Sequence, residues 1–138
     1  MPEKQTVKRA QRAKRQGKAP TTQAGEFVRE EIEHVREGKH GARSTKQAIA
    51  IGLSKARRAG VRLRPPRKGA ASESTRKSAS RDYRKGQRGR KRKPSARRSR
   101  ATLRALKREP RSTASRRALS KQAQSAAKRR RRRGSAGV

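Results

Sequence analysis

The excess of positive charge limits what this chain can fold into more than any other feature of its sequence. The 138 residues include 45 Lys and Arg against 9 Asp and Glu, which gives a formal net charge of +36. Leu, Ile, Val and Phe together number only 14. Chains with this balance are expected to be disordered, because they bury too little apolar surface to offset the entropy of ordering. We therefore expect a mostly disordered protein.

The charge divides the chain into three segments. Residues 1–21 form a basic arm, 22–66 a nearly ordinary middle, and 67–138 a tail rich in Arg, Lys, Ser and Ala, with net charges of +6, +5 and +25. Most of the large apolar residues lie in the middle segment. We expect residues 22–66 to form a small helical module and both flanking arms to lack fixed structure, although parts of the tail would permit helix formation on phosphates.

Apolar spacing in the middle segment predicts the first of two helices. From about Gln23 to Glu37, the side chains of Val28, Ile32 and Val35 recur on one face, as in an amphipathic helix. Gly38 is placed where a glycine would end that helix. Thr22 is its predicted N-cap.

A second helix is predicted after a short turn, so that the pair over about 22–60 resembles a helix-turn-helix. It opens with the capping box Ser44–Gln47, in which the hydroxyl accepts the N–H of Gln47. Gly52 weakens the helix interior, and close approach of the first helix would explain its presence. Because a unit this small shields its apolar face poorly, we expect a homodimer or a ligand to cover it.

The residues Lys39-His40-Gly41 and the run Lys46–Ala56, KQAIAIGLSKA, are similar to a known family. They resemble a bacterial family of small, very basic proteins described as a domain of unknown function, over roughly residues 28–63. Family members often have an acid after the Ser, where this chain has Lys55. The resemblance implies a bacterial source and no particular mechanism. The tail is similar in composition to the tails of linker histones and bacterial histone-like proteins.

The charge also indicates the partner. A chain this basic binds polyanions by releasing their counterions, whatever their sequence. Single-stranded RNA readers stack bases on aromatic side chains, and this chain has only Phe27 and Tyr83. We therefore expect a sequence-nonspecific, histone-like DNA-binding protein of the bacterial cytoplasm, associated with the nucleoid. The alternative is a ribosomal or ribosome-associated protein that binds structured RNA.

Several basic clusters are candidate contacts. Residues 87–94 resemble an AT-hook, in which a glycine between two arginines lets the backbone enter the A·T minor groove. The second cluster is a run of five arginines near the C-terminus, which suits a phosphate clamp. The candidate nucleic-acid-binding residues are Arg57, Arg58, Arg88, Arg90, Lys91, Arg92, Lys93, Arg97, Arg98, Arg129, Arg130, Arg131, Arg132 and Arg133.

The acids of the first helix are expected to share one solvated face and to pair locally, as in Glu26–Arg29 and Glu33–Arg36. These acids are Glu26, Glu30, Glu33 and Glu37. The alternative is that they form a docking strip for the chain's own basic tail or for a basic partner.

Other functions find no support in the sequence. There is no cysteine, and the two histidines, His34 and His40, stand without an evident set of metal ligands. The longest apolar run, Ala48–Ile51, is far shorter than the roughly 18 residues of a membrane span. We expect no catalytic activity, no cofactor, no metal site and no membrane contact.

Overall fold

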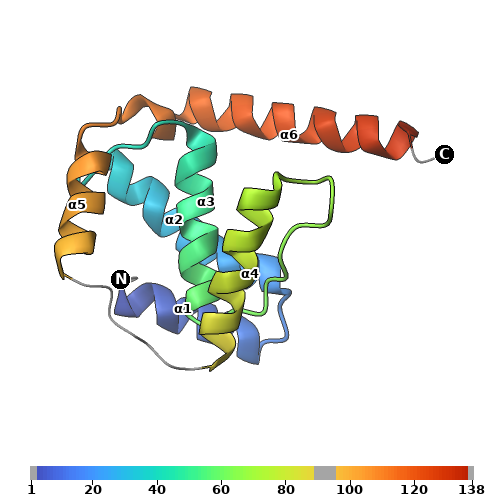
Figure 1. The fold of residues 1–138 in the computed structure, drawn as a ribbon, viewed down its shortest axis with the longest axis horizontal. Coiled ribbons are helices and arrows are strands. Elements are labelled where there is room, and N and C mark those ends of the chain that lie inside the picture. The colour runs from blue at the N-terminus through green and yellow to red at the C-terminus, as the bar shows by residue number, and fades with distance from the viewer. Residues whose placement is uncertain (1–2, 89–95, 137–138) are drawn as a thin grey trace.

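The structure is a computed structural model, and it describes residues 3–88 and 96–136. Helices account for most of these residues (Figure 1). No β-strand occurs among them. The expectation of a mostly disordered, low-complexity chain is therefore wrong, and the described chain is a folded all-α protein. Its elements are α1 Lys4–Arg15, α2 Pro20–Arg36, α3 Thr45–Arg58, α4 Glu73–Arg88, α5 Ala96–Lys107, the 3-10 helix η1 Ser112–Ala114 and α6 Arg116–Ala136.

Alanine explains why the charge argument failed. Small side chains let helices approach closely, and alanine loses no side-chain entropy on folding. A count of Leu, Ile, Val and Phe therefore underestimates what this chain packs. Eight of the eleven buried apolar residues are alanines, in the set Ala10, Ala13, Ala24, Phe27, Val35, Ala42, Ala48, Ala56, Val61, Ala79 and Ala114.

The predicted N-terminal arm is helix α1, which packs along α2. Ala10 belongs to the same buried cluster as Ala24, Phe27, Ala56 and Val61. Residues from α1, α2, α3 and the segment after α3 therefore share one core. The expectation that the N-terminal arm lacks fixed structure is wrong for its described residues, 3–21, because α1 carries an apolar face.

The predicted helix pair is present as α2 and α3, with shifted bounds. α2 begins at Pro20 rather than near Gln23, because proline fits the first helical position and needs no N–H partner there. The predicted cap of α3 is confirmed, since Ser44 Oγ accepts the Gln47 N–H at 3.1 Å. The Gln47 side chain reaches back to the Arg43 N–H at 2.6 Å, one residue before the capping box would place it.

The contact between α2 and α3 requires a glycine. A Cβ at Gly52 would lie 2.6 Å from Cα of Val28, closer than real Cβ contacts come. This confirms the prediction that Gly52 allows close approach of the two helices. The backbones of α2 and α3 approach each other closely at Gly52. This close approach lets a chain with few large apolar residues bury the facing sides of both helices.

Two glycine-to-alanine substitutions should therefore have opposite effects on the free energy of unfolding. Gly25→Ala adds a Cβ with no heavy atom within 4 Å, so it should stabilise the protein by up to about 1 kcal/mol through helix propensity. Gly52→Ala should destabilise it by about 1–2 kcal/mol, because separating α2 from α3 outweighs the same gain. Urea unfolding of both variants checks this, and equal shifts would contradict the close packing.

The tail also packs onto the helix pair. In α4, Ala79 is buried and Asp82 accepts a hydrogen bond from Ser54 Oγ of α3 at 2.6 Å. A Cβ at Gly86 would lie 1.7 Å from the Arg57 carbonyl oxygen, so α4 touches the C-terminal end of α3. The expectation of a disordered tail is wrong for these residues.

The 3-10 helix η1 closes the other end of the pair. Ala114 is fully buried with Val35, Ala42 and Ala48 in a second core cluster. The Thr113 hydroxyl donates to the Ala42 carbonyl at 3.2 Å. Because α1, α4 and η1 cover the apolar faces within one chain, the reason for expecting a homodimer no longer applies. None of the described helices is long and apolar enough to cross a membrane.

Candidate nucleic-acid interface

Acidic side chains in the α1–α4 part of the fold form ion pairs or are buried. Glu26 pairs with Arg9 of α1 at 3.0 Å, and Glu33 pairs with Arg29 at 3.1 Å. Glu30 is 2% exposed, so the expectation of a solvated acidic face is wrong there. The predicted pairs Glu26–Arg29 and Glu33–Arg36 are replaced by Glu26–Arg9 and Glu33–Arg29. Glu26 and Glu30 contact α1 rather than the tail.

The burial of Glu30 has a clear cause. One of its oxygens, Oε1, accepts the backbone N–H of Glu3 at 2.6 Å and the Thr6 hydroxyl at 3.1 Å. The carboxylate therefore satisfies the first turn of α1, where helical N–H groups have no partner within the helix. A residue that the sequence marks as surface charge serves as a helix cap in the fold.

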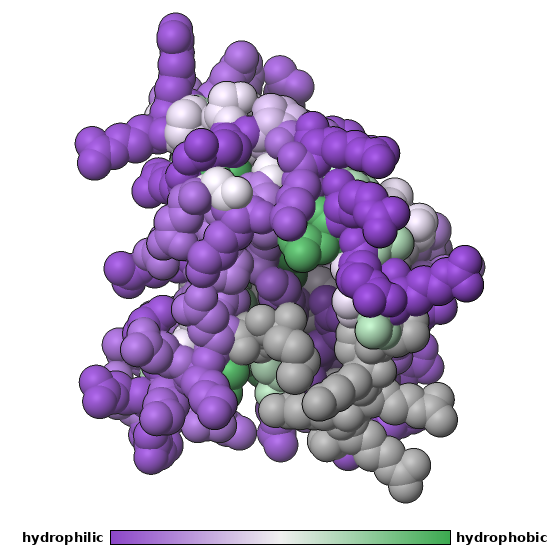
Figure 2. Space-filling view, turned by 90° about the vertical axis from the view of Figure 1, so that its left-hand side faces the viewer, coloured by the Kyte–Doolittle hydropathy of each residue, from purple (hydrophilic) through white to green (hydrophobic). Residues whose placement is uncertain are grey.

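The C-terminal part of the structure has almost no acid to balance its cations. Residues 96–136 contain 16 Lys and Arg and one acid, Glu109. No residue of α5 is buried. The face seen in Figure 2 is hydrophilic almost everywhere, with apolar colour only in small separate spots. The described residues 96–136 therefore carry a large excess of positive charge.

Helix α6 carries the longest unbroken run of cations in the sequence, Lys128–Arg133. Its N-terminus is capped by Ser115, whose Oγ accepts the Ala118 N–H at 3.1 Å. At 21 residues it is about 31 Å long, and its C-terminal half extends past the rest of the fold (Figure 1). The exposed run Arg129–Arg133 lies in that half. Five successive residues at 100° each surround the helix with guanidinium groups.

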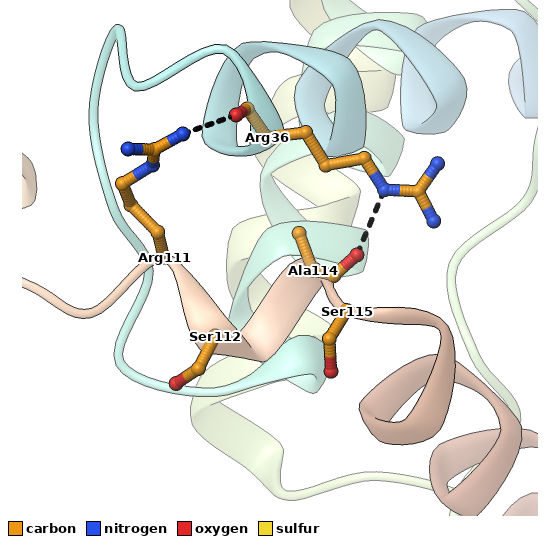
Figure 3. Close-up of a pocket in the computed structure, with 5 residues that line it drawn as sticks. All are labelled: Arg36, Arg111, Ser112, Ala114 and Ser115. Carbon is orange, nitrogen blue, oxygen red and sulfur yellow. Dashed lines mark hydrogen bonds between the residues drawn. The ribbon is translucent and has the colours of Figure 1, made fainter.

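A hollow of about 310 Å³ lies where α2, η1 and α6 meet, lined by two guanidiniums and two hydroxyls (Figure 3). Arg36 Nε donates to the Ala114 carbonyl at 2.9 Å, and Arg111 Nη2 donates to the Arg36 carbonyl at 2.5 Å. These bonds fix both side chains and leave further N–H groups, since a guanidinium has five. Ser112, Ala114 and Ser115 complete the lining.

A second hollow, of about 450 Å³, follows one face of α4. Its lining alternates cations with hydroxyls and carries no acid. Its residues are Ser74, Lys77, Ser78, Arg81 and Arg84. Neither hollow was identified from the sequence, because their residues become neighbours only through helical turns and tertiary packing.

The structure uses one predicted contact residue internally. Arg57 is 8% exposed, and its guanidinium donates to the carbonyls of Leu63 and Arg64 at 3.0 and 3.2 Å. Burial lowers the pKa of the Arg57 guanidinium, and the charge of Asp82 opposes that shift. Arg57 thus holds the extended segment after α3 and is unsuited to a phosphate contact. Arg58 is exposed, with Nε 3.9 Å from Asp82 Oδ1.

The other predicted residues are not gathered into one site. Arg88 ends α4 as an exposed helical residue, which differs from the extended backbone of an AT-hook. The remainder of that motif, Arg90, Lys91, Arg92 and Lys93, lies outside the described residues. Arg97 and Arg98 are exposed on α5, and Arg129, Arg130, Arg131, Arg132 and Arg133 are exposed on α6.

Sequence reasoning missed a buried polar cluster at the end of α2. Glu31 is 1% exposed, and its carboxylate faces His34, His40 and Lys55. Donor atoms of Glu31 and the two histidines all lie within 4.8 Å of one another. The spacing of Glu31 and His34, one helical turn apart, was the available signal. His40 joins them only through the turn after α2.

A second carboxylate borders this cluster. Glu3, at the start of α1, accepts hydrogen bonds from His34 Nε2 at 3.2 Å and from Lys39 Nζ at 3.4 Å. The hydrogen bond with His34, followed by that with Lys39, lowers the pKa of Glu3 below its usual value. The same contact raises the pKa of Lys39. The start of α1 is therefore tied to the turn after α2 by charge.

Comparison with known proteins gives one result. No curated protein and no solved structure matches the chain. The model of a family of unknown function, DUF6496, matches residues 3–69. This segment holds α1, α2, α3 and the Glu31 cluster, and it is therefore similar to a domain of unknown function.

Proposed function

We propose that this protein binds duplex DNA without sequence preference, by neutralising phosphates with a folded, acid-poor surface. The observation that carries the proposal is the separation of charge within the fold. Acids are paired or buried among α1–α4, whereas residues 96–136 present 16 cations against one acid. Cations that neutralise phosphates release DNA counterions on binding, and this release drives nonspecific affinity. As part of the same proposal, the protein acts on nucleoid DNA in the bacterial cytoplasm.

The shape of α6 favours DNA over structured RNA. The major groove of B-DNA, about 12 Å wide, admits an α-helix, and α6 extends past the rest of the fold (Figure 1). The five exposed arginines Arg129–Arg133 are spread around the helix axis. The major groove of A-form RNA is too deep and narrow for such entry. Phe27 is 1% exposed, so one of the two aromatic residues is withheld from base stacking.

Two variants, each with five cations replaced by Gln and therefore with equal loss of charge, test the role of α6. In the first, Arg129 to Arg133 all become Gln. In the matched control, five exposed cations of α1 become Gln, namely Lys4, Lys8, Arg12, Lys14 and Arg15. Fluorescence anisotropy on a short DNA duplex measures affinity across a salt series. Because each lost phosphate contact flattens the log–log slope by about 0.9, the α6 variant should flatten it by about 4, and the control by less than 1.

The outcomes separate two parts of the proposal. Equal effects of the two variants would mean that the whole surface binds DNA and that α6 has no special role. Failure of the unmodified protein to bind duplex DNA at low salt would remove the proposed function itself. Competition with an RNA duplex of equal length should be weaker than with DNA, and stronger competition by RNA would favour the ribosome-associated alternative.

A further inference from the structure

Both histidines of the chain turn one ring nitrogen toward the same buried carboxylate. His40 Nε2 lies 3.3 Å from Glu31 Oε2, and His34 Nδ1 lies 4.0 Å from Glu31 Oε1. Glu31 and His40 are 1% and 8% exposed, and the side chain of His34 is 14% exposed. Two imidazoles and a carboxylate thus meet in an enclosed space at the end of α2.

The outward nitrogens of both rings already have acceptors. His40 Nδ1 lies 2.8 Å from the Gly41 carbonyl oxygen, which only accepts, so Nδ1 carries a proton. His34 Nε2 lies 3.2 Å from Glu3 Oε1 and donates to that carboxylate. A carboxylate or carbonyl on the outer N–H is the arrangement that orients histidine ligands of metals. It leaves the inner nitrogens free to act as ligands.

Only one oxygen of the carboxylate accepts a hydrogen bond. Lys55 Nζ donates to Glu31 Oε1, which accounts for half of the carboxylate. Glu31 Oε2 is buried and makes no hydrogen bond among the described residues. Because Gly41 holds a proton on His40 Nδ1, the lone pair of the neutral ring lies on Nε2, which faces Glu31 Oε2. In that form of the ring two electron-rich atoms face each other, and a cation between them would satisfy both.

We propose that Glu31, His34 and His40 bind one divalent transition-metal ion of the zinc class. Imidazole nitrogen and carboxylate oxygen are ligands that Zn²⁺ accepts in four-coordinate sites, at about 2.0–2.2 Å. Tetrahedral ligands at that distance lie about 3.4 Å apart, whereas the donor atoms here lie within 4.8 Å of one another. Binding needs side-chain shifts of about 1 Å and no change in the helices.

The ligands join α2 to the turn after it, Glu3 adds the start of α1 as an outer partner, and Lys55 adds α3. These elements lie in the segment that matches the domain of unknown function. The basic surfaces of α4, α5 and α6 supply no ligand, so the metal site is independent of the proposed DNA binding.

Nitrogen NMR of the untagged, full-length protein provides the first test. The chain has only two histidines, so every imidazole signal comes from this site. One equivalent of Zn²⁺ should shift both rings, with Nδ1 of His34 and Nε2 of His40 as the metal-bound atoms, whereas Mg²⁺ should shift neither because it prefers oxygen ligands. Signals that respond to pH but not to Zn²⁺ would identify a plain ion-pair network and overturn the proposal.

Single substitutions supply the second test, by calorimetric titration with Zn²⁺. His34→Gln and His40→Gln should each weaken binding by at least about 100-fold, and Glu3→Gln, which alters only an outer partner, by about 10-fold. Glu33→Gln is the matched control on α2, because Glu33 pairs with Arg29 away from the cluster, and it should leave the affinity unchanged. Unaltered zinc affinity in both histidine variants would overturn the assignment, and circular dichroism verifies that each variant is folded.

Discussion

Raising the salt concentration from about 50 to 200 mM should weaken the binding of this protein to a DNA duplex by about 10⁵-fold, if about ten phosphates are contacted. The physical reason is counterion release, which gives a slope near −9 for the logarithm of the binding constant against the logarithm of salt. The surface carries enough charge for this, since residues 96–136 alone hold 16 cations. Fluorescence anisotropy across a salt series measures the slope.

A shallow dependence would contradict the proposed mechanism. A slope weaker than about −3 would mean that few phosphates are neutralised and that charge is not the main source of affinity. Duplexes of different sequence but equal length are the control, and they should give the same slope and similar affinities. A strong preference for one sequence would show that base contacts contribute, which the proposed mechanism excludes.

The substitution Phe27→Ala should destabilise the protein by about 3–5 kcal/mol. Phe27 is the largest side chain that is fully buried, at 1% exposure, and it packs with Ala10, Ala24 and Ala56 across three helices. Alanines cannot expand to fill the space that the ring would leave. Since small domains have about 5–15 kcal/mol of stability, this loss should unfold much of the protein at moderate urea concentrations. Urea unfolding followed by circular dichroism measures the shift in midpoint.

Leu103→Ala is the matched control, because it also removes a large apolar side chain. Leu103 lies on α5 and is 42% exposed, so its substitution should change the free energy of unfolding by less than about 0.5 kcal/mol. Similar, small effects of both substitutions would show that the alanine-rich interior is not a cooperative core. Such a result would also revive disorder as a description of the chain.

The sequence was sufficient for features that depend on neighbours along the chain. The two central helices, the Ser44 cap and the glycine that ends α2 all follow from local patterns, and each is present. The role of Gly52 was also predictable, because a glycine in a helix interior needs a compensating contact. These signals are local because caps and helical faces involve residues within one or two turns.

The disorder prediction failed because it counted only large side chains. Alanine was treated as part of a featureless tail, yet Ala79 and Ala114 from that tail are buried against α3 and α2. Whether an alanine contributes to a core depends on how closely another helix approaches it, and that distance is a tertiary property. Composition therefore gave the wrong result for the described residues of both flanking segments, 3–21, 67–88 and 96–136.

For the candidate sites, charge was visible in the sequence and placement was not. Net charge is a sum over residues that folding leaves unchanged, so the expectation of a polyanionic partner rests on +36 alone. Only in the folded chain does the Arg57 guanidinium donate to backbone carbonyls and the Glu31 carboxylate lie close to two histidines. Burial and pairing depend on helices that are distant in the chain but adjacent in space, and only the tertiary structure brings those helices together.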